Sequence, residues 1–410
     1  MMERAFADAG KTTSWAVLAP LLLGIVLSLD VSVAYGGDWT TKAQVSQGLE
    51  VNDNRPLTTR SPGTTVESIS RATLDAMKIL PGSRFGVGGD LGFRALGGAG
   101  ADDFDNPIDN SLWFKFDTVD KLTKYNLLGS WRRQDAVSAQ IEDSGLNTVR
   151  GDINMFVLEG GLKRQLSAVD SLSWTTLGKY VDIESSTAAP FSDVVLTAAW
   201  TRRQTATLDL FQQLQVEFLT VDDAANTRTQ FLRSTTGFQA HLTKDTTFRS
   251  SAGAGWVDTE RDGSEAIVGP VSGVTLSSAS RFGVLADAEL TWRPLHGTQG
   301  SIFAYHNLMP NTVGEIEQRT RFGIGVKHAI NKSSVLNLSA EISRQEYLDR
   351  VLVNGSTDFV RVTASHGYQW TPEWQTRIAY KFTHRQDDLG GANSNAVLVS
   401  VVRDINLAGR

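Results

Sequence analysis

Histidine is the side chain that most often carries acid–base chemistry or binds zinc at neutral pH, so the histidines are the first candidates for a site. They stand singly, without the paired spacing of a zinc site and without a distinctive serine motif beside them, at His241, His296, His306, His328, His366 and His384. The absence of cysteine excludes thiolate metal sites, cysteine nucleophiles and disulfides. We therefore predict no enzymatic activity, no metal and no cofactor.

Three short motifs could bind a ligand. Residues 86–90 (Gly-Val-Gly-Gly-Asp) are glycine-rich, but no helix pattern follows them as in a nucleotide fold, so crowding or bending of a strand is the favoured interpretation. Residues 102–106 (Asp-Asp-Phe-Asp-Asn) have calcium-binding oxygens without the spacing of a calcium loop, which favours a solvated acidic loop. Residues 52–54 (Asn-Asp-Asn) have the same two interpretations, and Asx-type turns are favoured.

A series of charged side chains alternates with apolar ones in the second half of the chain. The basic members of the series are Arg281, Arg293, Arg319, Arg321, Lys327, Arg361, Arg377 and Lys381. Its acidic members are Asp287, Glu289 and Glu341. If this face lines a water-filled pore, its basic excess concentrates anions and repels cations. The alternative is that the arginines and acids form internal ladders that only make the protein rigid.

The elements that carry these side chains have a hydrophobic period of two. From Trp39 onward, apolar and polar residues alternate in runs such as 282–292, 336–342 and 374–382. Each run is roughly ten residues long, the length of a tilted membrane-spanning strand. Strands of a soluble sandwich are usually only about five or six residues long. The run length therefore favours a transmembrane barrel.

The connections between the runs alternate between short and long. Short ones are expected at 80–83, 119–121, 167–170, 203–206, 243–246, 331–333 and 371–373. Long ones are expected near 52–65, 96–110, 135–148, 182–191, 220–228, 259–278, 308–315, 346–356 and 386–393. This alternation is typical of barrels with short periplasmic turns and longer extracellular loops. We predict an all-β, antiparallel up-and-down barrel of about eighteen strands, with about sixteen as the alternative.

Tryptophans fall at the ends of the predicted strands. They are Trp174, Trp200, Trp292 and Trp374 at the periplasmic ends, and Trp131 and Trp256 at the extracellular ends. Aromatic rings at both limits of an apolar band are typical of membrane–water interfaces. A large soluble barrel or propeller with aromatic caps is the alternative.

The N-terminal segment predicts secretion. Arg4 and Lys11 precede an apolar stretch over 15–29, and small residues at 32 and 34 suit a cleavage site. We predict a cleaved signal peptide over 1–34 and a barrel over 35–410, with an uncleaved anchor as the alternative. No later stretch approaches the ~18 apolar residues of a membrane-spanning helix. The formal net charge of −6 across 410 residues argues against a nucleic-acid partner.

Four segments resemble a known family. They are residues 49–54, 162–172, 241–248 and 394–400, which respectively open the barrel, form two strand–turn–strand units and close it. The chain resembles the β-barrel porin 2 family of Gram-negative outer-membrane barrels, although it ends Leu407-Ala408-Gly409-Arg410 rather than on a terminal aromatic. The resemblance implies a multi-pass barrel of the cell outer membrane, often associated with exopolysaccharide or surface export, and supplies no catalytic residues.

We therefore expect a porin-like channel for passive or weakly anion-preferring passage of small solutes. One alternative is the exit pore of an exopolysaccharide export system, and another is a plugged structural or adhesive barrel. The expected partners are outer-membrane lipid, lipopolysaccharide and the barrel-assembly machinery, with a periplasmic export partner for the exit pore. The sequence leaves the transported substrate and the oligomeric state open.

Overall fold

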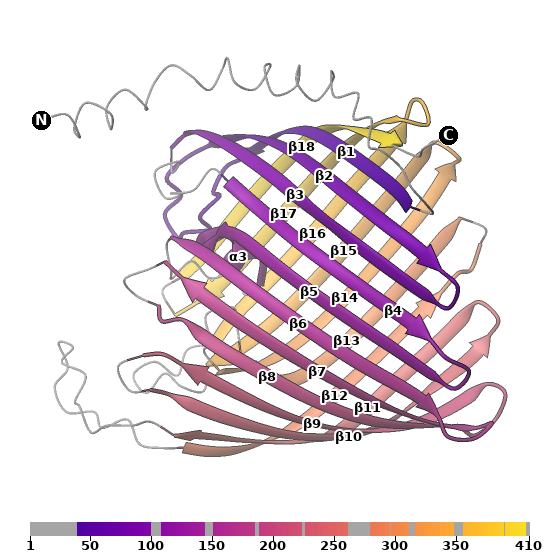
Figure 1. Cartoon of the computed structure of the whole chain (residues 1–410). Coiled ribbons are helices and arrows are strands. Elements are labelled where there is room, and N and C mark those ends of the chain that lie inside the picture. Colours follow the sequence, from indigo (N-terminus) through magenta and orange to yellow (C-terminus); the bar gives the residue numbers. More distant parts are fainter. Residues whose placement is uncertain are drawn as a thin grey trace, which may run out of the picture.

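A computed structural model describes residues 39–99, 108–143, 151–184, 188–223, 226–260, 279–295, 297–310, 316–347, 356–388 and 390–406. Nearly all of them belong to long antiparallel strands that wrap into a tilted barrel (Figure 1). The signal peptide predicted over 1–34 and the acidic motif 102–106 lie outside the described residues. The signal peptide and its cleavage site stay predictions.

Eighteen strands form one sheet, which confirms the predicted fold and the higher of the two strand counts. The strands are β1 (Trp39–Asn52), β2 (Thr65–Leu80), β3 (Ser83–Gly98), β4 (Ile108–Val119), β5 (Thr123–Asp135), β6 (Asp152–Gln165), β7 (Asp170–Ile183), β8 (Phe191–Arg203), β9 (Leu208–Val221), β10 (Arg228–Thr243), β11 (Thr246–Glu260), β12 (Ala279–Trp292), β13 (Thr298–Pro310), β14 (Ile316–Asn331), β15 (Ser334–Tyr347), β16 (Ser356–Gln369), β17 (Trp374–Asp387) and β18 (Gly390–Asn406).

The sheet closes on itself because β1 pairs with both β2 and β18. Glu50, for example, lies opposite Glu67 on β2 and opposite Leu398 on β18. Closure leaves no strand edge with unpaired backbone groups, which is the condition for a sheet to lie in hydrocarbon.

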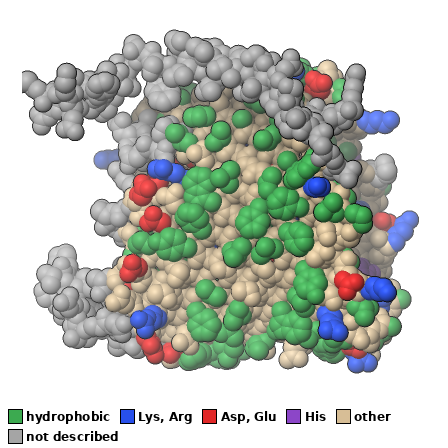
Figure 2. Space-filling view, viewed as in Figure 1, with side chains coloured by type: hydrophobic (Ala, Val, Ile, Leu, Met, Phe, Trp, Pro, Cys, Tyr) green, Lys and Arg blue, Asp and Glu red, His purple; other side chains and the backbone are tan. Residues whose placement is uncertain are grey.

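The alternation along each strand divides apolar from polar side chains. On β12 the outward Phe282 and Val284 are 73% and 61% exposed, whereas the inward Leu285, next to Val284, is buried. Figure 2 shows hydrophobic side chains over the middle of the outer wall and charged side chains toward its two ends. An apolar band around a closed sheet is stable in lipid and not in water. The protein is therefore a multi-pass β-barrel of the outer membrane.

The short turns fall where the sequence predicts them, at one end of the barrel (Figure 1). In the turn between β2 and β3, Gly82 has φ +78°, a conformation that favours glycine. One further short turn, 293–297 between β12 and β13, is not among the predicted ones. In this turn Gly297 has φ +82°, a conformation that favours glycine.

The expected long connection over 386–393 is wrong. β17 continues to Asp387 and β18 begins at Gly390, so only two residues separate the strands. Polar side chains pair across this hairpin: His384 Nδ1 lies 2.7 Å from Asn393 Oδ1, and Tyr380 donates to Asn395 over 2.7 Å. Because these polar side chains hydrogen-bond to each other across the two strands, the strands can continue through them.

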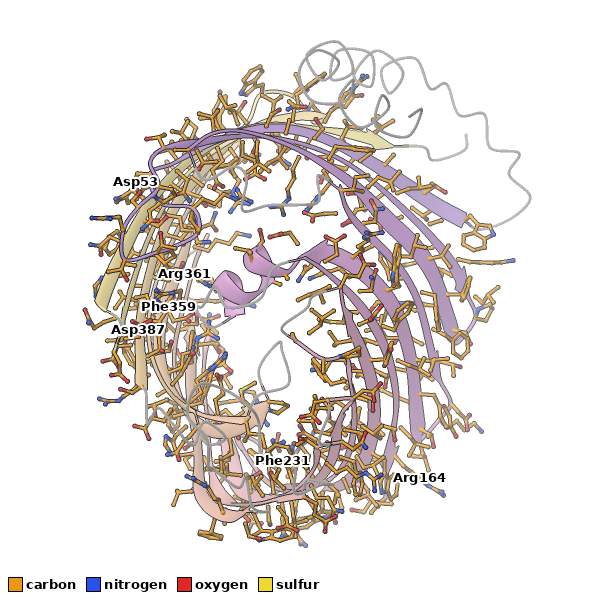
Figure 3. The ribbon with its side chains drawn as sticks, turned by 90° about the vertical axis from the view of Figure 1, so that its left-hand side faces the viewer. Asp53, Arg164, Phe231, Phe359, Arg361 and Asp387 are labelled. Carbon is orange, nitrogen blue, oxygen red and sulfur yellow. The ribbon has the colours of Figure 1, made fainter. Side chains whose placement is uncertain are left out.

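One helix stands in the described part of the chain, α3 (Ala136–Asp143), which follows β5. Figure 3, a view into the barrel, shows α3 inside the ring of strands. Among the described residues, no helix is long and apolar enough to cross a membrane.

Candidate functional site: the barrel interior

The inward face of the strands carries most of the charged side chains. On β14, the outward Phe322 and Ile324 alternate with the inward Arg321 and Gly323. Arg321 contacts inward side chains from both neighbouring strands, donating to Tyr305 over 3.1 Å and forming an ion pair with Glu341. Arg321 thus links side chains of three adjacent strands on the inner face.

Arg319 is held in a local ion pair. It pairs with Glu317 of the same strand, and both side chains are almost fully buried, with Arg319 3% exposed. Arg385 pairs with Asp387 on β17 in the same way, over 3.2 Å. For these arginines and for Arg321, the structure has internal ion pairs, the alternative to an anion-attracting wall.

Lys327 and Arg377 differ from those arginines. Both side chains are exposed, and within the described residues neither has a carboxylate at ion-pair distance. Arg377 donates only to the Ser365 hydroxyl, over 3.4 Å. Their charges are therefore available to ions in water.

Three further predicted basic residues occupy different positions on the wall. The Arg361 guanidinium lies 5.0 Å from the centre of the Phe359 ring, in register with Glu341. Lys381 lines an interior cavity beside Glu50 and Arg94. Arg281 is an exposed side chain near the start of β12.

Arg293 does not lie on the strand wall. β12 ends at Trp292, and Arg293 belongs to the periplasmic turn, where its backbone N–H donates to Asp245 over 2.8 Å. The following Pro294 has no N–H to continue the ladder, which explains why the strand stops there. Arg293 is therefore a residue of the rim.

The predicted acids also lie on inward positions. Asp287 accepts a hydrogen bond from Ser251 and lies opposite Tyr305 of β13. Glu289 lies opposite Arg249 of β11. Glu341 is the ion-pair partner of Arg321.

The six predicted interface tryptophans share the outward face. At the extracellular side, three rings follow one another across strands: Phe156 is 6.5 Å from Trp131 and 6.3 Å from Tyr180. At the periplasmic side, the Arg403 guanidinium lies 5.3 Å from the Trp374 ring. The outward tryptophans are Trp131, Trp174, Trp200, Trp256, Trp292 and Trp374.

A loop that folds into the barrel was not predicted. Residues 53–64 connect β1 to β2, and Leu57 in this loop is fully buried against Phe359 of β16 and Ala392 of β18. Arg55 pairs with Glu67, which also pairs with Arg94 over 3.2 Å. Burial, with a smaller effect of the positive Arg94, lowers the pKa of Arg55 to about 10, so the guanidinium stays charged at neutral pH.

The motif over residues 52–54 fixes this loop. The Asn52 side-chain oxygen accepts from the Asn54 N–H over 2.9 Å, an Asx turn, and from Ser394 over 2.8 Å. The Asn54 amide donates to the carbonyl oxygens of Thr58 and Asn393, each over 2.8 Å. No group of acids or histidines in the described residues could hold a metal ion. The structure therefore supports the turn interpretation of this motif.

The helix α3 packs on an apolar collar at the same end of the barrel. Asp135 caps it by accepting from the Ser138 N–H over 2.7 Å, and Arg55 of the inward loop reaches the Ser138 hydroxyl over 3.4 Å. The collar consists of buried inward residues contributed by successive strands: Ile153, Val181, Ile183, Phe191, Leu219, Phe231, Val257, Leu285, Leu308 and Ile316. Loop 53–64 and α3 together narrow the interior.

Several aromatic rings lie flat on the interior wall at glycines. A Cβ on Gly88 would stand 2.6 Å from the Trp113 ring, and one on Gly237 would stand 2.5 Å from the Phe211 ring. The same holds for Phe303 at Gly323, at 2.4 Å. The crowding expected at residues 86–90 is therefore present. The sequence alone could not show which ring covers each glycine, because the pairs come from different strands.

The comparisons with known proteins find likenesses among solved structures only. No protein-family model matches the chain, and no curated protein matches it. OccK9 (OpdG) of Pseudomonas aeruginosa is 11% identical with a TM-score of 0.49, covering 90% of this chain and 100% of its own. A BenF-like porin from Pseudomonas fluorescens Pf-5 is 11% identical with a TM-score of 0.48, covering 90% and 99%. OccAB2 of Acinetobacter baumannii is 10% identical with a TM-score of 0.48, covering 91% and 100%. The resemblance to the β-barrel porin 2 family stays a prediction.

Proposed function

We propose that this protein is a porin-like channel that lets small solutes cross the outer membrane passively, with a weak preference for anions. The observation that carries the proposal is the closed 18-stranded sheet with an apolar outer band and a charged, hydrogen-bonding inner face. Barrels of about 16–18 strands are wide enough for an aqueous path. Within a membrane, the polar inner face can be solvated only by water inside the barrel.

The inward segments favour small solutes over a polymer. Loop 53–64 is fixed to the wall by Leu57 and Asn54, and α3 is fixed by its cap and by the apolar collar. Both occupy the extracellular end of the interior, where an exported polysaccharide would have to leave. This arrangement supports the small-solute channel more strongly than the exit pore.

The anion preference is assigned to the cations without carboxylate partners. A guanidinium that pairs with an adjacent carboxylate, as Arg319 and Arg321 do, presents little net charge to a passing ion. Lys327 on β14 and Arg377 on β17 are exposed, and among the described residues neither has a carboxylate at ion-pair distance. Fixed positive charge on the wall of a narrow aqueous path raises the local concentration of anions.

The test is ion selectivity in planar bilayers under a salt gradient. We expect Lys327→Glu combined with Arg377→Glu to move the reversal potential toward cation preference. The matched control is Arg164→Glu, because Arg164 is an exposed, outward-facing cation at the periplasmic end of β6 (Figure 3). An unchanged reversal potential in the double variant would contradict the anion preference.

A further inference from the structure

A second feature of the interior is a cavity of about 230 Å³ on the wall formed by β9 to β13. We propose that it binds one unit of a neutral saccharide on its way through the channel. The proposal rests on the proposed function, since the ligand reaches the cavity from the aqueous path. The side chains that would contact the sugar are Gln213, Gln215, Arg249, Ser251, Asp287 and Tyr305.

Sheet pairing brings these residues together from four strands, β9, β11, β12 and β13. Gln213 and Gln215 project from β9, and Arg249 and Ser251 project from β11. Asp287 of β12 lies in register with both Ser251 and Tyr305, which joins β11 to β13. The side chains converge on one patch of wall although they span almost a hundred positions of sequence.

The cavity has a fixed cation at one side. The Arg249 guanidinium lies 4.7 Å from the centre of the Phe211 ring, within the range of a cation–π contact. Phe211 in turn lies against Gly237, where a Cβ would stand 2.5 Å from the ring. Arg249 is exposed and lines the cavity, and among the described residues no carboxylate lies at ion-pair distance from it.

The charges around the cavity balance. The lining contains the Arg249 guanidinium and the Asp287 carboxylate, and the charge of its other cation, Arg233, is neutralised by Glu217 over 2.6 Å. The other polar groups of the lining are amides, hydroxyls and the His306 imidazole. A carboxylated or cationic ligand would therefore meet one group of its own sign, whereas a neutral ligand meets none.

Sugar hydroxyls suit this mixture of groups. Each hydroxyl both donates and accepts, and the cavity offers acceptors on Asp287, donors on Arg249, and both on Gln213 and Gln215. The Tyr305 ring offers an apolar surface for the C–H groups of a pyranose. One sugar ring bound here would displace the water that fills the cavity.

The test uses the whole barrel in detergent micelles and in planar bilayers, with glucose as the neutral probe and glucuronate as the acidic one. We expect saturation transfer by NMR from the barrel to glucose, and a glucose-dependent reduction of single-channel current. Gln213→Ala combined with Gln215→Ala removes two hydrogen-bonding groups and should weaken glucose binding about fivefold to tenfold. Gln212→Ala is the matched control, because Gln212 is exposed on the outer face of β9, where it lies opposite the outward Trp200 of β8.

The outcomes separate this site from the channel itself. A conducting barrel that shows neither saturation transfer nor current block with glucose overturns the saccharide site and leaves the channel intact. Saturation transfer to glucose in a barrel that does not conduct supports the site and contradicts the channel. Stronger binding of glucuronate than of glucose, or equal weakening by Gln212→Ala, also overturns the proposal.

Discussion

At the scale of single residues, glycines on the inner face decide where aromatic rings can lie. Trp113 lies over Gly86 and Gly88, and a Cβ on Gly88 would also meet Asp75. The sequence predicts crowding at this segment, because glycines inside a strand often mark a place where another group approaches the backbone closely. The partner ring could not be predicted, since it depends on the register between β3 and β4.

Replacing Gly88 tests this close approach. Gly88→Ala places a methyl group 2.6 Å from the Trp113 ring, so the ring must move, at a cost of about 1–3 kcal/mol in the free energy of unfolding. Gly97→Ala on the same strand is the control, because a Cβ there meets nothing within 4 Å. Urea unfolding in lipid vesicles, followed by tryptophan fluorescence, measures both. Equal stability of the two variants would contradict the packing.

The contribution of an ion pair on the inner wall to stability depends on how deeply the pair is buried. Arg233 and Glu217 are both buried, and Arg233 also donates to the Leu308 carbonyl oxygen over 2.7 Å. Such a pair costs desolvation to form, so its net contribution is small, but removing one partner leaves a buried charge alone.

Replacing Arg233 tests how the two buried charges depend on each other. Arg233→Ala should lower the free energy of unfolding by about 3–5 kcal/mol because Glu217 keeps a buried charge without its partner. Adding Glu217→Gln should recover part of the loss, since a neutral amide is less costly to bury. Urea unfolding in lipid vesicles measures the stability of both variants. A double variant no more stable than Arg233→Ala would show that the unpaired charge of Glu217 is not the cause of the loss.

At the scale of elements, the strands follow from alternation and the turns from their polar residues. β12 is an example: the outward run from Phe282 to Trp292 and the inward run from Arg281 to Glu289 both fall as the period of two predicts. The helix α3 could not be predicted in the same way. It has eight residues, too few for a stable isolated helix, and its burial depends on the interior of a barrel that must already exist.

The cap of α3 gives a prediction for this element. Asp135→Ala removes the acceptor for the Ser138 N–H and should destabilise α3 by about 1 kcal/mol. Because α3 lies inside the barrel, we expect a noisier open-channel current with a larger mean conductance. Asp135→Asn keeps a side-chain acceptor and should behave as the unmodified protein does. An Asp135→Ala variant with the conductance and current noise of the unmodified protein would mean that α3 does not narrow the path.

At the scale of the whole molecule, the division into an outer and an inner face was predictable, whereas the pairing of inner charges was not. Alternation assigns Arg321 and Arg377 to the same face. Only the sheet shows that Arg321 lies between Tyr305 and Glu341 while Arg377 contacts Ser365. Register between strands is a property of the closed barrel, and it decides which cations remain available to ions.

The most direct test of the account is single-channel recording of the purified, folded barrel in a planar lipid bilayer. Insertion can be verified independently by protection of the strands from protease in vesicles. The closed sheet with its polar interior predicts discrete, reproducible steps of ion current. Barrels that insert and resist protease but carry no ionic current would contradict a continuous aqueous path and would leave a plugged structural barrel as the better description.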